Sequence, residues 1–307
     1  MTLSVVSTLY MSKPFLDTFI KEIVSAINDL KIDDYELVFV NDGSPDDSLQ
    51  FLLEKKKEVS EIKIIDLSRN FGHHYAMQAG LLHAKGDLVF LIDNDLETPP
   101  SFLKDCYREI HKDDTIDVVF GYQEERKGGF IENFGGRLFW WAINKFSEVK
   151  IPKNIATERL MKRAYLNSLL SLGDTNLFLG GMMHWAGYNQ KGIPVTRGLR
   201  EGKSTYSTKK RLELMLQAVT SFSGKPLEYL FYTGICITFF SLLAIVFLLV
   251  KKVVLGDSIQ LGWTSLVAIN ILILGVISTF LGLIGIYLFK IFKQVQNRPN
   301  VIIRKIY

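Results

Sequence analysis

Cysteine is nearly absent from this chain of 307 residues. The two cysteines, Cys106 and Cys236, lie far apart in the sequence, and the second falls within an apolar run. No disulfide framework or cysteine-based zinc site can be built from such a pair. The scarcity of cysteine therefore fits a reducing compartment for the water-soluble part of the protein.

A strong excess of charge of one sign is also missing, because the formal net charge is only +4 at pH 7. We therefore expect no nucleic-acid partner. No Gly-X-Gly-X-X-Gly sequence follows a predicted strand, which argues against a dinucleotide cofactor. The chain begins without a basic segment followed by an apolar one, so we expect no cleaved signal peptide.

Uncharged runs long enough to cross a membrane are absent from the first two thirds of the chain but occur twice in the last third. The runs Tyr229–Val250 and Leu261–Phe289 contain no charged residue. A helix of about 20 apolar residues crosses a bilayer, so each run predicts a transmembrane helix. The short connection permits only a tight hairpin, which we place over residues 227–290. The alternative interpretation is a pair of helices buried inside a soluble protein.

The placement of Lys and Arg predicts the orientation of this hairpin. Basic residues precede the first run and follow the second, whereas the connection holds only Lys251 and Lys252. Because Lys and Arg are enriched in cytoplasmic segments, we expect both termini, including a basic tail over 291–307, in the cytoplasm. The protein would then be a multi-pass protein of the inner (plasma) membrane. Ser278 and Gly282 have the spacing with which membrane helices pack, so a homo-oligomer is compatible with the sequence.

Residues 206–226, before the first run, have the pattern of an amphipathic helix. Basic residues cluster at the start of this segment, and its apolar residues recur with helical spacing. Such a helix lies in the interface between membrane and water. The alternative is a helix packed on the core of the preceding domain. The residues predicted to share the apolar face are Leu212, Met215, Leu216, Val219 and Phe222.

The first 205 residues alternate between short apolar runs and helical patterns. Repeated strand–helix units predict an α/β domain with a Rossmann-like, doubly wound and mostly parallel sheet. In such sheets, ligands lie at the carboxyl ends of the strands. The predicted strands cover residues 3–9, 36–40, 63–67, 87–92 and 118–121, and the predicted helices cover 15–30, 48–59 and 75–84.

Two carboxylates, Asp93 and Asp95, end the apolar strand over 87–92. Mg²⁺ and Mn²⁺ are hard cations that one or two carboxylates hold together with phosphate oxygens. A metal here would offset the charge that builds on a leaving nucleoside diphosphate. Glu97 would add a third oxygen ligand.

Asp42 follows the strand over 36–40 in the sequence Asn-Asp-Gly-Ser. One interpretation is an ordinary strand-to-helix loop in which Ser44 caps the following helix. The other is a carboxylate that accepts hydrogen bonds from a nucleobase. Because parallel strands end at the same edge, we expect Asp42 in the same crevice as Asp93 and Asp95.

Several motifs occur in the order found in one enzyme family. The chain resembles the family 2 glycosyltransferases, and specifically the polyprenyl-phosphate branch with the dolichol-phosphate mannose synthases and the undecaprenyl-phosphate glucosyltransferases of O-antigen modification. The resemblance covers nearly the whole chain and includes the two apolar runs. The motifs that carry it are Val38–Ser44, Arg69–His74, Asp93–Pro100, Arg159–Met161 and Gly202–Tyr206.

The resemblance implies a GT-A fold, a nucleotide-sugar donor, Mg²⁺ or Mn²⁺ as cofactor, and inversion at the sugar. It places Asp42 at the nucleobase and assigns ribose and metal to Asp93 and Asp95, with Glu97 where the family usually has Gln. The other nucleotide-sugar residues would be Thr8, Tyr10, Ser44 and Asn94. Asp95, Glu158 and Arg159 are the candidate catalytic residues, and Arg159, Arg200, Lys203, Ser204 and Tyr206 would bind the acceptor phosphate.

Three motifs depart from the family pattern. The usual Pro-X-Tyr-Asn-Glu is Thr8–Ser12 here, so a carboxylate expected at the nucleotide is missing. The usual Asp before Phe-Arg-Leu-Met is Thr157, and a carboxylate appears one place later, at Glu158. The usual Gly-Glu-Ser-Lys-Tyr is Gly202–Tyr206, with the basic residue shifted.

The identity of the acceptor depends on whether the reaction needs a general base. A sugar hydroxyl needs one, and Glu158 is the candidate. A phosphate monoester is mostly dianionic at pH 7 and attacks without a base. We therefore predict hexose transfer to a polyprenyl (undecaprenyl-type) phosphate at the cytoplasmic membrane face, for cell-surface polysaccharide modification. The alternatives are a glycan hydroxyl acceptor and a non-catalytic, membrane-tethered homologue.

Overall fold

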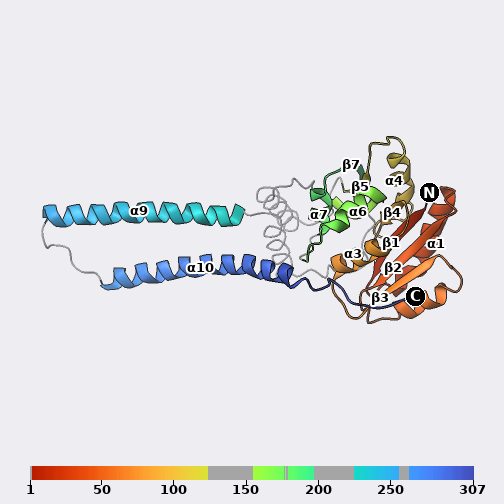
Figure 1. Cartoon of the computed structure of the whole chain (residues 1–307), viewed down its shortest axis with the longest axis horizontal. Helices are drawn as coiled ribbons and strands as arrows, with labels where there is room; N and C mark the ends of the chain where they lie inside the picture. The colour runs from red at the N-terminus through yellow and green to blue at the C-terminus, as the bar shows by residue number, and fades with distance from the viewer. Residues whose placement is uncertain (1, 124–154, 176, 178, 197–224, 256–262) are drawn as a thin grey trace.

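The computed structural model describes residues 2–123, 155–175, 177, 179–196, 225–255 and 263–307. Within these ranges, an α/β domain is built on one mixed sheet. Two long helices extend side by side from the domain, and both ends of the chain lie on it (Figure 1).

The centre of the sheet is parallel and its flanks are mixed. The strand order is β7-β5-β6-β4-β1-β2-β3-β8. Strands β4, β1, β2 and β3 run parallel, whereas β6 and β8 are antiparallel to their neighbours. The predicted doubly wound centre is thus confirmed, within a mixed sheet. The strands are β1 (Leu3–Leu9), β2 (Tyr35–Asn41), β3 (Ile62–Leu67), β4 (Leu88–Leu91), β5 (Val118–Tyr122), β6 (Ile155–Lys162), β7 (Gln190–Pro194) and β8 (Ile303–Ile306).

Helices cover both faces of the sheet, which explains why the central strands are apolar on both sides. Successive residues of β1 illustrate this, since Val5 packs into one core and Val6 into the other. Helices α1, α2 and α4 line the first core, and α3, α6 and α7 the second. Their bounds are α1 (Lys13–Asp29), α2 (Ser48–Lys55), α3 (His73–His83), α4 (Phe102–Ile110), α6 (Arg163–Ser171) and α7 (Leu179–Trp185).

The two predicted apolar runs are helical, as α9 (Lys225–Leu255) and α10 (Trp263–Gln296). Among the described residues, Ile273–Gln296 is the segment with the length and composition of a membrane span, with mean hydropathy 2.0. A pair of spans is therefore not confirmed. Nearly all of the predicted interface helix over 206–226 lies outside the described residues.

The end of the chain corrects one prediction. The sequence predicted a separate basic tail over 291–307, but α10 continues to Gln296 and β8 then joins the sheet, antiparallel to β3. The physical reason is that β3 offers an open edge whose backbone groups pair with a short strand. The basic residues in this strand hid its strand character, because strand formation depends strongly on such tertiary context.

Candidate active site

The carboxyl ends of β1, β2 and β4 meet at one edge of the sheet, as predicted. The register pairs Leu9 with Asn41 and Val6 with Leu91. Side-chain contacts connect the ends: Asn94 Nδ2 donates to the Thr8 carbonyl oxygen at 2.8 Å. The predicted residues Thr8, Asp42, Ser44 and Asp93–Asp95 therefore lie together with Asn41 and Gly43 at the carboxyl ends of these strands, the region called the crevice below.

His73, which belongs to the predicted Arg69–His74 motif but was not among the candidate site residues, also lies in this crevice. Its Nδ1 lies 3.0 Å from Thr8 Oγ1, and its Nε2 lies 3.4 Å from Asp93 Oδ1. Desolvation lowers the pKa of His73. The negative charges of the nearby carboxylates Asp42, Asp95 and Glu158 oppose this shift. The sequence signal for His73 was its place in the Arg69–His74 motif, which follows a core strand.

Asp42 is 3% exposed and holds the loop that follows β3. Its two carboxylate oxygens accept hydrogen bonds from the backbone N–H groups of Phe71 and Gly72, at 2.7 and 3.0 Å. Burial raises the pKa of Asp42, and these two hydrogen bonds oppose the rise. Asp42 therefore orders the crevice wall, and its predicted contact with a nucleobase stays a prediction.

Ser44 does not cap α2, whose N-cap residue is Asp47. Instead, Met11 N donates to Ser44 Oγ at 2.7 Å, and Ser44 Oγ donates to Asp46 Oδ1 at 2.6 Å. Met11 has a left-handed φ of 55°, and Tyr10 beside it is 52% exposed. Ser44 thus fixes the turn after β1 that presents Tyr10 to solvent.

Gly43 lets the loops after β2 and β3 touch backbone to backbone. Its φ is +62°, and a Cβ there would lie 2.5 Å from Asn70 N and 2.7 Å from the Arg69 carbonyl carbon. Only glycine accommodates both the left-handed backbone and this approach. The Asn-Asp-Gly-Ser motif therefore has a steric reason for its glycine.

Asp93 and Asp95 supply oxygen donors of the kind that Mg²⁺ and Mn²⁺ prefer. Asp95 Oδ1 accepts the backbone N–H of Glu97 at 3.0 Å, which closes a tight turn around Leu96, at φ 59°. No group of three His, Cys, Asp or Glu residues suited to a metal occurs in the described part of the chain. The predicted third ligand, Glu97, is therefore not gathered with the two aspartates into such a group. The pair alone fits a metal that substrate phosphate oxygens also bind.

Glu158 and Arg159 lie on β6, and each is only 1% exposed. Arg159 pairs with Leu91 in the sheet, so Glu158 lies beside the carboxyl end of β4. The Arg159 side chain donates to the Thr157 and Ala156 carbonyl oxygens, at 3.1 and 3.3 Å, and burial lowers its pKa. The structure therefore places Arg159 inside the domain rather than on the crevice wall.

The remaining predicted acceptor residues cannot be placed. Arg200, Lys203, Ser204 and Tyr206 all lie outside the described residues. Their predicted contacts with an acceptor phosphate stay predictions.

A family model and several known proteins match this chain. The model of Glycosyl transferase family 2 matches residues 4–170, which hold β1 to β6. The glycosyltransferase YkcC of Bacillus subtilis (strain 168), described as uncharacterized, is 34% identical over 90% of this chain and 85% of its own. The SfII prophage-derived bactoprenol glucosyl transferase of Shigella flexneri is 31% identical, over 99% of this chain and 98% of its own.

A solved structure shows the same fold at low identity. The mannosyltransferase PcManGT from Pyrobaculum calidifontis, in complex with GDP-Man and Mn²⁺, aligns with a TM-score of 0.50 and 16% identity. The alignment covers 96% of this chain and 86% of that protein. The predicted GT-A-like fold is thereby supported. The chain belongs to glycosyl transferase family 2 and is a glycosyltransferase, with bactoprenol glucosyl transferases among its relatives, as its motifs predict.

Proposed function

We propose that this enzyme transfers a hexose from a nucleotide diphosphate-sugar to a polyprenyl phosphate, with inversion at the anomeric carbon. The observation that carries the proposal is the crevice of Asp93, Asp95 and the Asp42 loop in a chain whose last helices are long and apolar. The bactoprenol glucosyl transferase name of a relative that aligns over nearly the whole chain supports this acceptor class.

Asp93 and Asp95 would hold Mg²⁺ or Mn²⁺ together with the donor diphosphate. The metal would neutralise charge on the leaving nucleoside diphosphate. His73 restrains the Asp93 carboxylate from one side, and the turn around Leu96 fixes Asp95. Preorganised carboxylates need little rearrangement when the donor binds, which favours catalysis.

The burial of Glu158 favours a phosphate acceptor over a hydroxyl. A general base must come within hydrogen-bond reach of the proton that it removes. Glu158 is 1% exposed, so an acceptor hydroxyl cannot reach its carboxylate in this arrangement. A phosphate acceptor already carries its nucleophilic oxygen and needs no such base.

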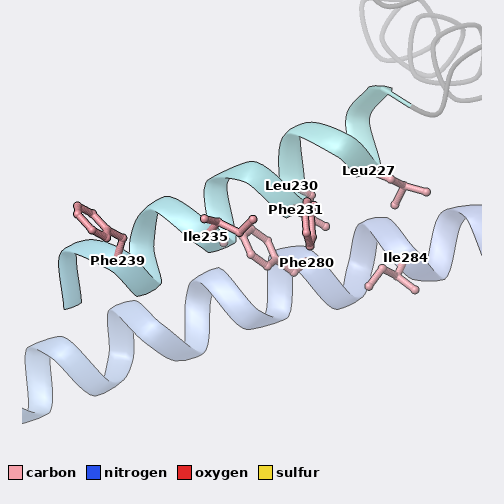
Figure 2. A pocket seen from close by; sticks show the side chains of 8 residues that line it. Leu227, Leu230, Phe231, Ile235, Phe239, Phe280 and Ile284 are labelled. Atoms are coloured by element: carbon pink, nitrogen blue, oxygen red, sulfur yellow. The ribbon is translucent and has the colours of Figure 1, made fainter. Parts of the chain in front are cut away.

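An apolar groove between α9 and α10 is a candidate site for the isoprenoid chain of the acceptor. Figure 2 shows Phe280 of α10 reaching toward α9, between Phe231 and Ile235. The groove lies along the half of α9 that is nearer the α/β domain (Figure 1). Its lining residues are Leu227, Leu230, Phe231, Gly234, Ile235, Phe239, Phe280 and Ile284.

The direction of the two helices favours the predicted topology. The start of α9 and the end of α10 are the ends of these helices nearer the α/β domain (Figure 1). If both helices span the inner membrane, the domain and both termini lie on one side, and the basic residues around them favour the cytoplasm. The product would then be a lipid-linked hexose for cell-surface polysaccharide modification. A homo-oligomer stays a prediction.

The proposal is tested with the full chain in nanodiscs, supplied with undecaprenyl phosphate, a panel of nucleotide sugars, and Mg²⁺ or Mn²⁺. We expect one donor to yield a metal-dependent glycolipid, detected by mass spectrometry. Asp95→Ala should abolish the product, whereas Asp105→Ala, on exposed α4 surface, should preserve it. Product formation unaffected by Asp95→Ala or by chelation would contradict the proposal.

A further inference from the structure

Strand β8 contains a register shift, so that one of its residues has no opposite residue in β3. Ile306 lies opposite Ile65, Lys305 opposite Asp66 and Ile303 opposite Leu67. Arg304 is therefore the extra residue of a bulge. Bulges re-aim side chains and occur frequently beside active sites.

The bulged Arg304 binds two residues at the carboxyl end of β3. Its Nη1 lies 3.3 Å from Asp66 Oδ2, and its Nη2 donates to the Ser68 carbonyl oxygen at 2.7 Å. The Asp66 side chain is 2% exposed, whereas that of Arg304 is 60% exposed. A buried carboxylate requires such partners, because its desolvation is costly.

Asp66 also contacts the loop after β2 through its other carboxylate oxygen. Asn41 Nδ2 donates to Asp66 Oδ1 at 2.8 Å, which leaves Asn41 Oδ1 to accept the backbone N–H of Ser44 at 3.1 Å. Ser44 in turn holds the turn that presents Tyr10. One side of the crevice is thus connected to the end of the chain by a series of hydrogen bonds.

The second contact of Arg304, with the Ser68 carbonyl oxygen, also connects it to the loop after β2. Ser68 begins the segment whose Phe71 and Gly72 amides donate to Asp42. That segment also touches Gly43 backbone to backbone. Both contacts of Arg304 are therefore connected, through neighbouring residues, to the loop Asn41–Ser44.

We propose that Arg304 is a positioning residue for the donor site, and that β8 is required to give the loop Asn41–Ser44 its binding geometry. This inference rests on the proposed function, since it assigns that loop to the nucleotide sugar. The same stretch of chain is tied to the domain before β8 as well. Gln294 Oε1 accepts the Thr175 N–H at 3.1 Å, and Asn300 Nδ2 donates to Gln78 Oε1 at 2.8 Å. The end of helix α10 and the segment that leads from it to β8 are thereby attached to the α/β domain.

The test compares Arg304→Gln with Arg304→Lys and with Lys305→Gln, the neighbouring position, whose cation lies over the Tyr307 ring. We measure the dissociation constant and KM for the nucleotide sugar, kcat, KM for undecaprenyl phosphate, and the thermal unfolding midpoint. Arg304→Gln should weaken donor binding about fivefold, because an exposed partner contributes about 1 kcal/mol. kcat and the acceptor KM should change less than about twofold. Arg304→Lys should recover part of the loss, and Lys305→Gln should match the wild type.

Donor binding unchanged by Arg304→Gln would overturn the inference, whether or not the unfolding midpoint falls. A second variant, Asp66→Asn, should weaken donor binding by itself, because its amide would face the Arg304 guanidinium. In the double variant Asp66→Asn with Arg304→Gln, the two new amide side chains can hydrogen-bond to each other, so the two losses should not add. Additive losses would contradict the connection. If the wild type neither binds nucleotide sugars nor transfers a hexose, the proposed function fails instead.

Discussion

The Nε2 atom of His73 lies 3.4 Å from Asp93 Oδ1, and this contact connects the start of α3 to the end of β4 that we propose holds the metal. Partners that orient a metal ligand typically contribute 10- to 100-fold to activity. We predict that His73→Ala lowers kcat/KM for the donor about tenfold. His83→Ala, at the other end of α3, is the matched control and should leave kcat/KM unchanged. Equal effects of the two substitutions would show that the contact has no role.

Gly43→Ala should disrupt the donor loop while the rest of the domain stays folded. The added Cβ would lie 2.5 Å from Asn70 N, and the left-handed backbone costs about 1–2 kcal/mol for a non-glycine residue. We expect nucleotide-sugar binding to be lost or to weaken more than about tenfold, by isothermal titration calorimetry. At Gly180 a Cβ meets nothing within 4 Å, so Gly180→Ala is the control. Normal binding by Gly43→Ala would mean that the loop does not hold the donor.

The burial of Arg159 predicts an effect on stability rather than on acceptor binding. Removing this side chain opens a cavity and breaks its hydrogen bonds inside the domain. We expect Arg159→Ala to lower the unfolding free energy by about 2–4 kcal/mol, measured by denaturant titration. Arg108→Ala, on the exposed side of α4, should have little effect. A stable variant with a greatly increased acceptor KM would instead restore the phosphate-binding interpretation.

His74 should make the protein less stable as the pH falls below neutral. Burial lowers its pKa to about 4, whereas the unfolded chain has the ordinary value of 6.5. Between pH 6.5 and about 4, the unfolded state binds a proton that the folded state does not, so stability falls through this window. We expect His74→Gln to reduce the loss between about pH 7 and about pH 5, as measured by thermal unfolding midpoints. An identical pH dependence in the variant would show that His74 does not titrate in this way.

The core strands of the domain were predictable because their apolar runs are buried on both faces. The strand at Leu3–Leu9 was predicted with its observed bounds, and the placement of Asp42 and Asp93 at the same end of the sheet followed from the parallel order. The turn at Gly43 was predictable for a different reason, because the local backbone geometry restricts which residue fits there.

Other features depend on contacts between distant segments, which a single sequence does not display. Strand β8 forms only because β3 offers an edge, and its Arg304 reaches Asp66 from the far end of the chain. His73 lies in the Arg69–His74 motif, but its contacts with Thr8 and Asp93 depend on neighbours that folding provides. The motif around Arg159 predicted a phosphate contact, but on β6 that side chain is buried and donates to carbonyl oxygens of its own strand.

The most direct test of the central claim compares two acceptors that differ only in the phosphate. Wild-type protein in nanodiscs receives its preferred nucleotide sugar, a divalent metal, and either undecaprenyl phosphate or undecaprenol, and products are identified by mass. The account predicts a hexosyl phosphate lipid with the first acceptor and no product with the second. Transfer to the undecaprenol hydroxyl, or to an added glycan with no lipid phosphate product, would contradict it.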